Sequence, residues 1–182
     1  MKRIAYVLAS AILLAGAAMA APANLKLDEA APAFSLKTPE GKTIASGDLR
    51  GRFAVVHFAA TWCPFCAAEA PNLEKLYRDY RDRGVLVYII DVKEQAGTVT
   101  KNFRKFGFSF PLLLDLEGTV ARSFAPPATI LPDLARDEVM IASNLIIDRE
   151  GKIRFFSLLD SAHFDAKLVG LRAQLDKLLA EK

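Results

Sequence analysis

The segment that most constrains this chain is residues 62–66, which read Trp-Cys-Pro-Phe-Cys and contain both cysteines of the protein. An apolar run over residues 53–60 precedes it and predicts a buried strand, and an amphipathic stretch that predicts a helix follows it. Proline is favoured in the first turn of a helix, because its ring presets φ and its missing N–H would be unpaired there anyway. We therefore expect a strand, a short loop and a helix that begins at Cys63.

A cysteine at the start of a helix faces free backbone N–H groups and the positive end of the helix dipole. This position stabilises the thiolate, which is the reactive form of the side chain. Lowering a thiol pKa from ~8.5 to ~7 corresponds to roughly 2 kcal/mol in favour of the anion. Cys66 lies one helical turn after Cys63, within reach for a disulfide. The spacing is typical of a redox-active dithiol.

Two other interpretations of the cysteine pair are a zinc site and a structural disulfide. A tetrahedral zinc site needs four ligands, but outside the pair the chain offers only His57, His163 and carboxylates. We therefore predict no bound metal and no cofactor. A structural disulfide across so short a loop would constrain the unfolded chain less than a long-range one would. Redox chemistry is favoured over both.

Residues 55–71 resemble the active-site segment of thioredoxin-like proteins, in particular the extracytoplasmic TlpA/ResA type within the redoxin and AhpC/TSA-related superfamily. The resemblance is carried by the strand, the pattern A-T-W-C-x-x-C and the pattern E-x-P that follows it. It extends to an N-terminal hairpin over residues 31–42 and to later strands at 110–115 and 146–153. It implies a thiol–disulfide oxidoreductase.

The implied fold class is α/β, a thioredoxin fold with a mixed central β-sheet flanked by helices and an N-terminal β-hairpin extension. The residue pattern agrees with this order of elements. We expect the hairpin at 34–36 and 42–44, strands at 53–60, 85–90, 111–114, 140–147 and 152–158, and helices at 63–83, after Thr98, and around 164–178. Residues 21–182 should form one domain.

The first 20 residues have the layout of a secretory signal peptide. Met1-Lys2-Arg3 is a basic start, an apolar run follows, and small residues end at Ala20. The run is shorter than the ~20 residues of a membrane-spanning helix. We therefore expect cleavage after Ala20 and a periplasmic protein. Removing two basic residues lowers the net charge from +3 to +1, too balanced a charge to predict nucleic-acid binding.

Several residues beside the cysteines are candidates for supporting roles. Trp62 is expected either to shield the sulfur and contact substrate or to pack, and Phe65 adds apolar surface without charge. His57 stands where related families place a buried Asp or Asn, and is either a proton relay or a neutral core histidine. Glu69 matches the glutamate of E-x-P, and either tunes a thiol or lies on a solvated face. Pro64 is the last of these supporting candidates, as the first-turn proline of the helix.

One position departs from the family pattern. The family normally has a cis-proline facing the cysteines, six residues before the aspartate of its I-D-x-x-G turn. Counting back from Asp148 gives Ala142, whereas Pro126, Pro127 and Pro132 all come too early. A trans peptide bond is expected before Ala142, since a cis bond without proline costs about 2.5–4 kcal/mol. The absence of the proline at position 142 is expected to change how a substrate docks. It does not change the prediction of a redox-active dithiol.

The function predicted from these observations is reduction of protein disulfides by Cys63 and Cys66. A membrane electron donor of the DsbD kind is the implied partner, and we expect a monomer. Three alternatives share the fold: a peroxiredoxin-like peroxidase, a Sco-like copper-binding protein and a redox-silent interaction module. The peroxidase array P-x-x-x-T-x-x-C is absent, because Val56 and Ala60 stand at its proline and threonine positions. A Sco-type site would need a wider cysteine spacing and a distant histidine.

Overall fold

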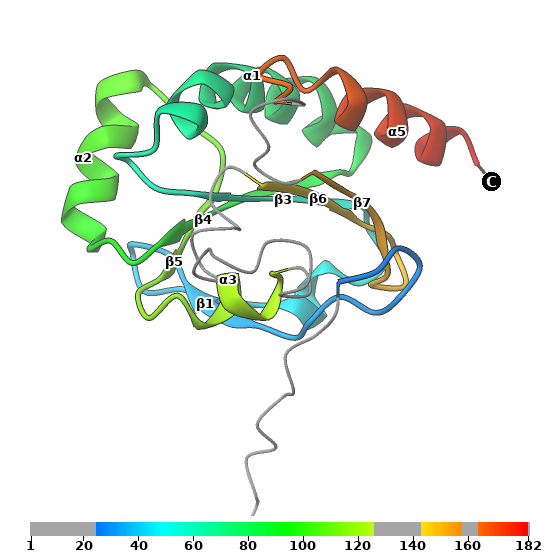
Figure 1. Ribbon diagram of the computed structural model, residues 1–182, viewed down its shortest axis with the longest axis horizontal. Coiled ribbons are helices and arrows are strands. Elements are labelled where there is room, and N and C mark those ends of the chain that lie inside the picture. The colour runs from blue at the N-terminus through cyan, green and yellow to red at the C-terminus, as the bar shows by residue number, and fades with distance from the viewer. Residues whose placement is uncertain (1–24, 126–142, 158–163, 182) are drawn as a thin grey trace, which may run out of the picture.

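A mixed β-sheet forms the centre of the molecule, with helices on both of its faces (Figure 1). The computed structural model describes residues 25–125, 143–157 and 164–181. In chain order the elements are β1 (Ser35–Lys37), β2 (Thr43–Ala45), η1 (Ser46–Leu49), β3 (Ala54–Ala59), α1 (Pro64–Tyr80), η2 (Arg81–Arg83), β4 (Leu86–Val92), α2 (Ala96–Phe106), β5 (Leu112–Asp115), α3 (Thr119–Ser123), β6 (Ser143–Ile147), β7 (Ile153–Ser157) and α5 (Val169–Ala180).

The strands of the described residues are ordered β2-β1-β5-β4-β3-β6-β7. The central strands β3, β4 and β5 are parallel. Strand β6 pairs antiparallel with β3, and β7 pairs antiparallel with β6. The hairpin β1–β2 pairs Leu36 with Ile44 and joins the other edge through β5. This topology confirms the predicted α/β class, the mixed sheet and the N-terminal hairpin.

The sheet has an apolar core on each face, and β3 contributes to both. Successive side chains of a strand point to opposite faces. Val56 and Phe58 pack in the core on the side of α3, whereas Val55 packs in the core formed with α1, α2 and α5. His57 and Ala59 share the face of Val55, and so the strand that leads to the cysteines presents a histidine towards α1.

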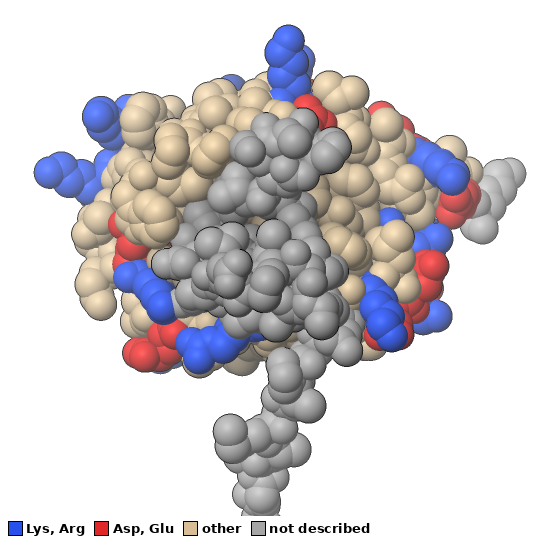
Figure 2. Space-filling view, viewed as in Figure 1, with Lys and Arg blue, Asp and Glu red and all other residues tan. Residues whose placement is uncertain are grey.

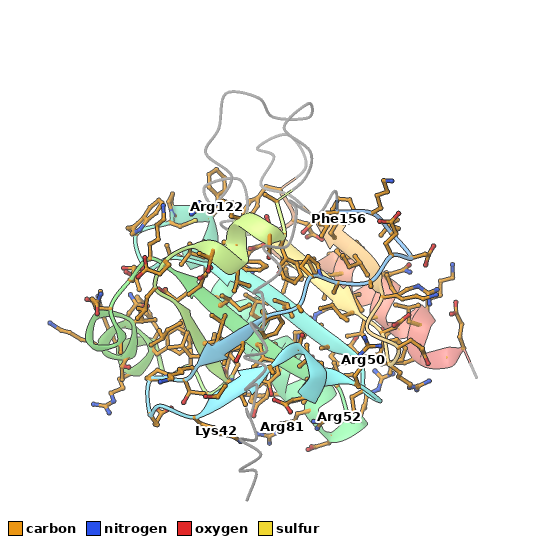
Figure 3. The ribbon with its side chains drawn as sticks, turned by 90° about the horizontal axis from the view of Figure 1, so that it is seen from below. Lys42, Arg50, Arg52, Arg81, Arg122 and Phe156 are labelled. Carbon is orange, nitrogen blue, oxygen red and sulfur yellow. The ribbon has the colours of Figure 1, made fainter. Side chains whose placement is uncertain are left out.

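The predicted hairpin between β6 and β7 is held by a buried aspartate. Oδ1 of Asp148 accepts hydrogen bonds from the backbone N–H groups of Glu150 and Lys152. Gly151 has a φ of 78°, which favours glycine. Arg50, labelled in the view from below (Figure 3), donates a hydrogen bond to the carbonyl of Glu150. The segment after η1 is thereby tied to this turn.

Two local predictions differ from the structure. Helix α2 begins at Ala96 with Gln95 as its N-cap, three residues before the N-cap expected at Thr98. Helix α3 was not predicted, because its apolar pattern is only one turn long. Its first turn is held instead by Asp115, whose carboxylate accepts from the N–H groups of Thr119 and Ala121.

Some predicted features lie outside the described residues. These are the signal peptide with its cleavage site after Ala20, the three prolines at 126, 127 and 132, Ala142 and its peptide bond, and His163. Among the helices that are described, none has the length and apolar character needed to cross a membrane.

Candidate active site

The two cysteines lie where β3 passes into α1, in the predicted geometry. Cys63 is the N-cap residue of α1, and Pro64 is the first residue of the helix. The sulfur of Cys63 accepts a hydrogen bond from the backbone N–H of Cys66 at 3.2 Å. Both residues are free thiols, so the structure describes the reduced dithiol. The helix start therefore offers its unpaired N–H groups to one sulfur only.

A nucleophile at a helix N-cap is expected to be exposed to its substrate, with the second cysteine more buried. That expectation is wrong for Cys63. Cys63 is only 3% exposed and Cys66 only 4%, so burial does not distinguish them. Ala60 and Phe65 pack against the pair. The exposed residue of the motif is Trp62, at 65%. This exposure favours contact with a substrate over a packing role for Trp62.

The two thiols differ in acidity as predicted. The hydrogen bond from the Cys66 side chain, helped by the N–H groups of Cys66 and Phe65, lowers the pKa of Cys63 to about 7 against the opposing effect of burial. The same side-chain hydrogen bond and burial strongly raise the pKa of Cys66. Near neutral pH Cys63 is therefore about half ionised, and Cys66 keeps its proton.

We expect this difference to appear in alkylation of the reduced protein. The rate for Cys63 should rise with pH through a midpoint near 7, and Cys66 should react far more slowly at every pH below 9. Peptide mass mapping after timed iodoacetamide treatment measures both rates. Unfolded protein in urea is the control, in which both thiols should titrate together near ~8.5. Equal rates in the folded protein would contradict the assignment.

A buried hydrogen-bonded chain lies beside the dithiol and joins two strands and one helix. Nδ1 of His57 on β3 is 3.0 Å from Oδ1 of Asn144 on β6, and Nδ2 of Asn144 donates to Oε1 of Glu69 on α1 at 3.0 Å. Since the Asn144 amide donates to Glu69, it is the amide oxygen that faces the ring of His57. All three residues are at most 2% exposed. Glu69 is thus not on a solvated face.

Burial sets the ionisation of this chain. It lowers the pKa of His57 to about 4, against hydrogen bonds that favour the charged ring. It raises the pKa of Glu69 to about 8, opposed by the Asn144 amide and assisted by the charge of Cys63. Near pH 7 the imidazole is neutral and the carboxyl group protonated, so their 3.7 Å contact is not an ion pair. The ring is a weak base, which favours a packing role for His57.

Sequence reasoning missed Asn144, Thr61 and Glu94. Asn144 pairs with His57 across β3 and β6, residues that are far apart in the chain. Glu94 follows β4, and its carboxylate accepts hydrogen bonds from the backbone N–H and the hydroxyl of Thr61. This contact anchors the loop that carries the cysteines to the end of β4. Only the position of Thr61 in the A-T-W-C pattern hinted at such a role.

A cavity of about 390 Å³ lies beside the dithiol, between α1, α2 and the sheet. Cys66 and His57 line it, together with several phenylalanine rings, including that of Phe106, which is 55% exposed. The surface over α2 and the adjoining part of α1 is mainly uncharged on the side seen in Figure 2. Basic side chains project only from its outer edge. The surroundings of the dithiol are therefore largely apolar.

Other chemistries find less support in these residues. Within the described ranges there is no group of three or more His, Cys, Asp or Glu side chains that can hold a metal ion. Val56 and Ala60, at the positions of the peroxidase array, are buried apolar residues. They provide no hydroxyl group for a peroxide, and so the site geometry is that of a dithiol exchanger.

A thioredoxin fold with a C-x-x-C dithiol at the start of α1 defines the class of thiol–disulfide oxidoreductases, and comparison with known proteins assigns the chain to this class. The chain belongs to the AhpC/TSA family, which it matches over residues 27–156. Within that family it is similar to the thiol–disulfide oxidoreductase ResA. The enzyme is therefore a thioredoxin-like thiol–disulfide oxidoreductase.

The similarities extend over most of the chain. ResA of Bacillus thuringiensis is 26% identical over 130 residues, which cover 71% of this chain and 68% of that protein. ResA of Halalkalibacterium halodurans is 36% identical over 87 residues, covering 48% and 49% of the two chains. The structure of a thioredoxin-family thiol:disulfide interchange protein from Chlorobium tepidum superposes with a TM-score of 0.66 at 25% identity, covering 87% of this chain and all of that one.

Proposed function

We propose that this protein is a periplasmic reductase of protein disulfides. The observation that carries the proposal is the unequal pair of thiols. Cys63, with a pKa of about 7, is the nucleophile, and Cys66, whose pKa is raised, keeps its proton until the second step. The Cys63 thiolate attacks a substrate disulfide and forms a mixed disulfide with release of one substrate thiol. Cys66 then attacks the sulfur of Cys63 and releases the second.

The acidity of Cys63 bears on the direction of exchange. A dithiol becomes a strong oxidant when its thiolate is so well stabilised that the reduced form is preferred, as in DsbA with a nucleophile pKa of ~3.5. A pKa of about 7 is near that of thioredoxin. The dipeptide Pro64-Phe65 contributes no charge that would stabilise the thiolate further. These features support a reducing couple.

A reducing dithiol in an oxidising compartment needs a supply of electrons, for which we propose a membrane reductase of the DsbD kind. The proposed location rests on the signal-peptide pattern of residues 1–20 and on cleavage after Ala20. The exposed Trp62 and the apolar surface beside the dithiol support a protein substrate. We propose a single domain over residues 21–182 that acts as a monomer.

A redox titration of the purified protein against glutathione tests the direction. We expect a potential well below ~−200 mV, in the range of thioredoxin. Trp62→Ala, which alters the exposed ring and neither sulfur, should leave the potential almost unchanged while weakening reduction of a protein substrate such as insulin. A potential near the ~−120 mV of DsbA would identify an oxidant and refute the proposed direction.

A further inference from the structure

In the second step of exchange, Cys66 attacks the mixed disulfide that Cys63 has formed with the substrate. Cys66 must lose its proton before it can attack the mixed disulfide, yet burial and the hydrogen bond to Cys63 raise its pKa. Thiol–disulfide exchange proceeds only through attack by the thiolate. A proton acceptor must therefore lie within reach of Cys66. His57 is a poor acceptor, because its pKa of about 4 makes it a weak base and its Nδ1 is already bound to Asn144.

Asp91 lies on the wall of the same cavity as Cys66. It is in β4, pairs with Ala59 of the parallel strand β3, and is only 2% exposed. Because paired residues of adjacent strands point to the same face, Asp91 points towards α1, as His57 and Ala59 do. The volume of about 390 Å³ far exceeds the ~10–15 Å³ that one water molecule needs, so the cavity has room for a water-bridged path from Asp91 to Cys66.

Among the described residues, two buried carboxyl oxygens near the dithiol have no hydrogen-bond partner, Oδ1 of Asp91 and Oε2 of Glu69. Of these two residues only Asp91 lines the cavity. Buried carboxyl oxygens are nearly always bonded, and a catalytic role is one of the explanations for an unbonded one. Buried Asp115, at the end of the next strand, shows the ordinary arrangement, since both of its oxygens accept backbone N–H groups. Unlike Asp115, Asp91 keeps an oxygen available on a cavity that reaches a reactive thiol.

We propose that Asp91 accepts the proton of Cys66 during resolution of the mixed disulfide. This inference rests on the proposed dithiol exchange and assigns its second step. The proton passes from Cys66 to the Asp91 carboxylate, and the Cys66 thiolate attacks the sulfur of Cys63. The Cys63–substrate bond breaks, the Cys63–Cys66 disulfide forms, and the electron pair leaves with the substrate thiolate. The thiolate takes up a proton, and Asp91 returns its own to solvent.

The ionisation of Asp91 suits this role. Burial raises its pKa to about 8, assisted by the neighbouring charge of Glu94 and a hydrogen bond to it. An acceptor with a pKa near the working pH combines a populated basic form with adequate basicity. The other titratable or charged side chains on the cavity are His57 of β3, Cys66 of α1 and Lys105 of α2. None of these is a carboxylate.

Reaction of the reduced protein with dithiobisnitrobenzoate separates the two steps. Attack by Cys63 releases a first thionitrobenzoate, and attack by Cys66 on the mixed disulfide releases a second. In stopped-flow measurements, the second phase of wild-type protein should rise with pH through an inflection near 8. A second phase without an inflection there would overturn the proposal even if no variant folds.

Asp91→Asn is the decisive variant, because it keeps the shape of the side chain and removes its basicity. We expect the second phase at pH 8 to slow at least about tenfold and to lose the inflection, while the first phase stays within about twofold. Asp115→Asn is the matched control and should leave both phases unchanged. An inflection that persists in Asp91→Asn would assign it to Glu69, whose pKa is also about 8, and would refute the role of Asp91.

Glu94→Gln gives an independent check that a structural role would not pass. It removes the charge that raises the pKa of Asp91, while its amide oxygen can still accept one of the two hydrogen bonds from Thr61. The inflection of the second phase should therefore move to lower pH, and an unmoved inflection would count against Asp91. Failure of the proposed function looks different, because it would abolish the first phase or give an oxidising potential in the wild-type protein.

Discussion

Replacement of Cys63 by serine should abolish disulfide reduction, with a loss of at least about 10³-fold in the insulin assay. The hydroxyl group that replaces the thiol is not ionised near neutral pH, although the N-cap geometry is kept. Serine is itself a favoured N-cap residue, so α1 should remain as stable as in the wild-type protein. Loss of activity with an unchanged unfolding transition would locate the nucleophile at Cys63.

Cys66→Ala should have the complementary effect. Cys63 can still attack, but no second thiol exists in the chain to resolve the mixed disulfide. Substrate proteins should accumulate as covalent adducts that are visible on non-reducing gels and released by dithiothreitol. The Cys63→Ser variant, carried through the same trapping experiment, is the control and should capture nothing. Adducts through residue 66 in Cys63→Ser, or none in Cys66→Ala, would reverse the assigned roles.

The second large effect concerns stability in acid. Burial lowers the pKa of His57 to about 4 in the folded protein, whereas an unfolded histidine titrates near ~6.5. Between these values the unfolded chain binds a proton that the folded protein does not, so stability is lost as the pH falls. The difference between the two pKa values corresponds to roughly 3 kcal/mol in the free energy of unfolding between pH 6.5 and 4.

His57→Gln isolates this contribution, because glutamine does not titrate and can still donate to Asn144. Urea unfolding of both proteins across this pH range measures it. The stability advantage of the wild-type protein should shrink by roughly 3 kcal/mol as the pH falls, since acid destabilises the buried neutral ring and not the amide. Parallel pH profiles would show that His57 titrates normally in the folded protein, and would contradict its burial as a neutral ring.

Much of the fold could be predicted from sequence, because its signals are local. The apolar run before the cysteines, the β-branched strand at 85–90 and the turn at Asp148 each carry their own pattern, and each was found where it was expected. The N-cap position of Cys63 was equally predictable, since Pro64 marks the first helical residue. Short elements such as α3 were not predicted, because a single helical turn held by an aspartate that precedes it shows no periodic pattern of apolar residues.

The sequence by itself determined which sulfur is activated, because a helix start presents free N–H groups to one cysteine and not to the residue one turn later. Only the tertiary structure decided how the dithiol is enclosed. The burial of Cys63, the chain from His57 through Asn144 to Glu69, and the unbonded oxygen of Asp91 arise where β3 meets β4, β6 and α1. Strand pairing brings these residues together across long stretches of chain, and burial then shifts their pKa values. Neither effect leaves a local pattern in the sequence.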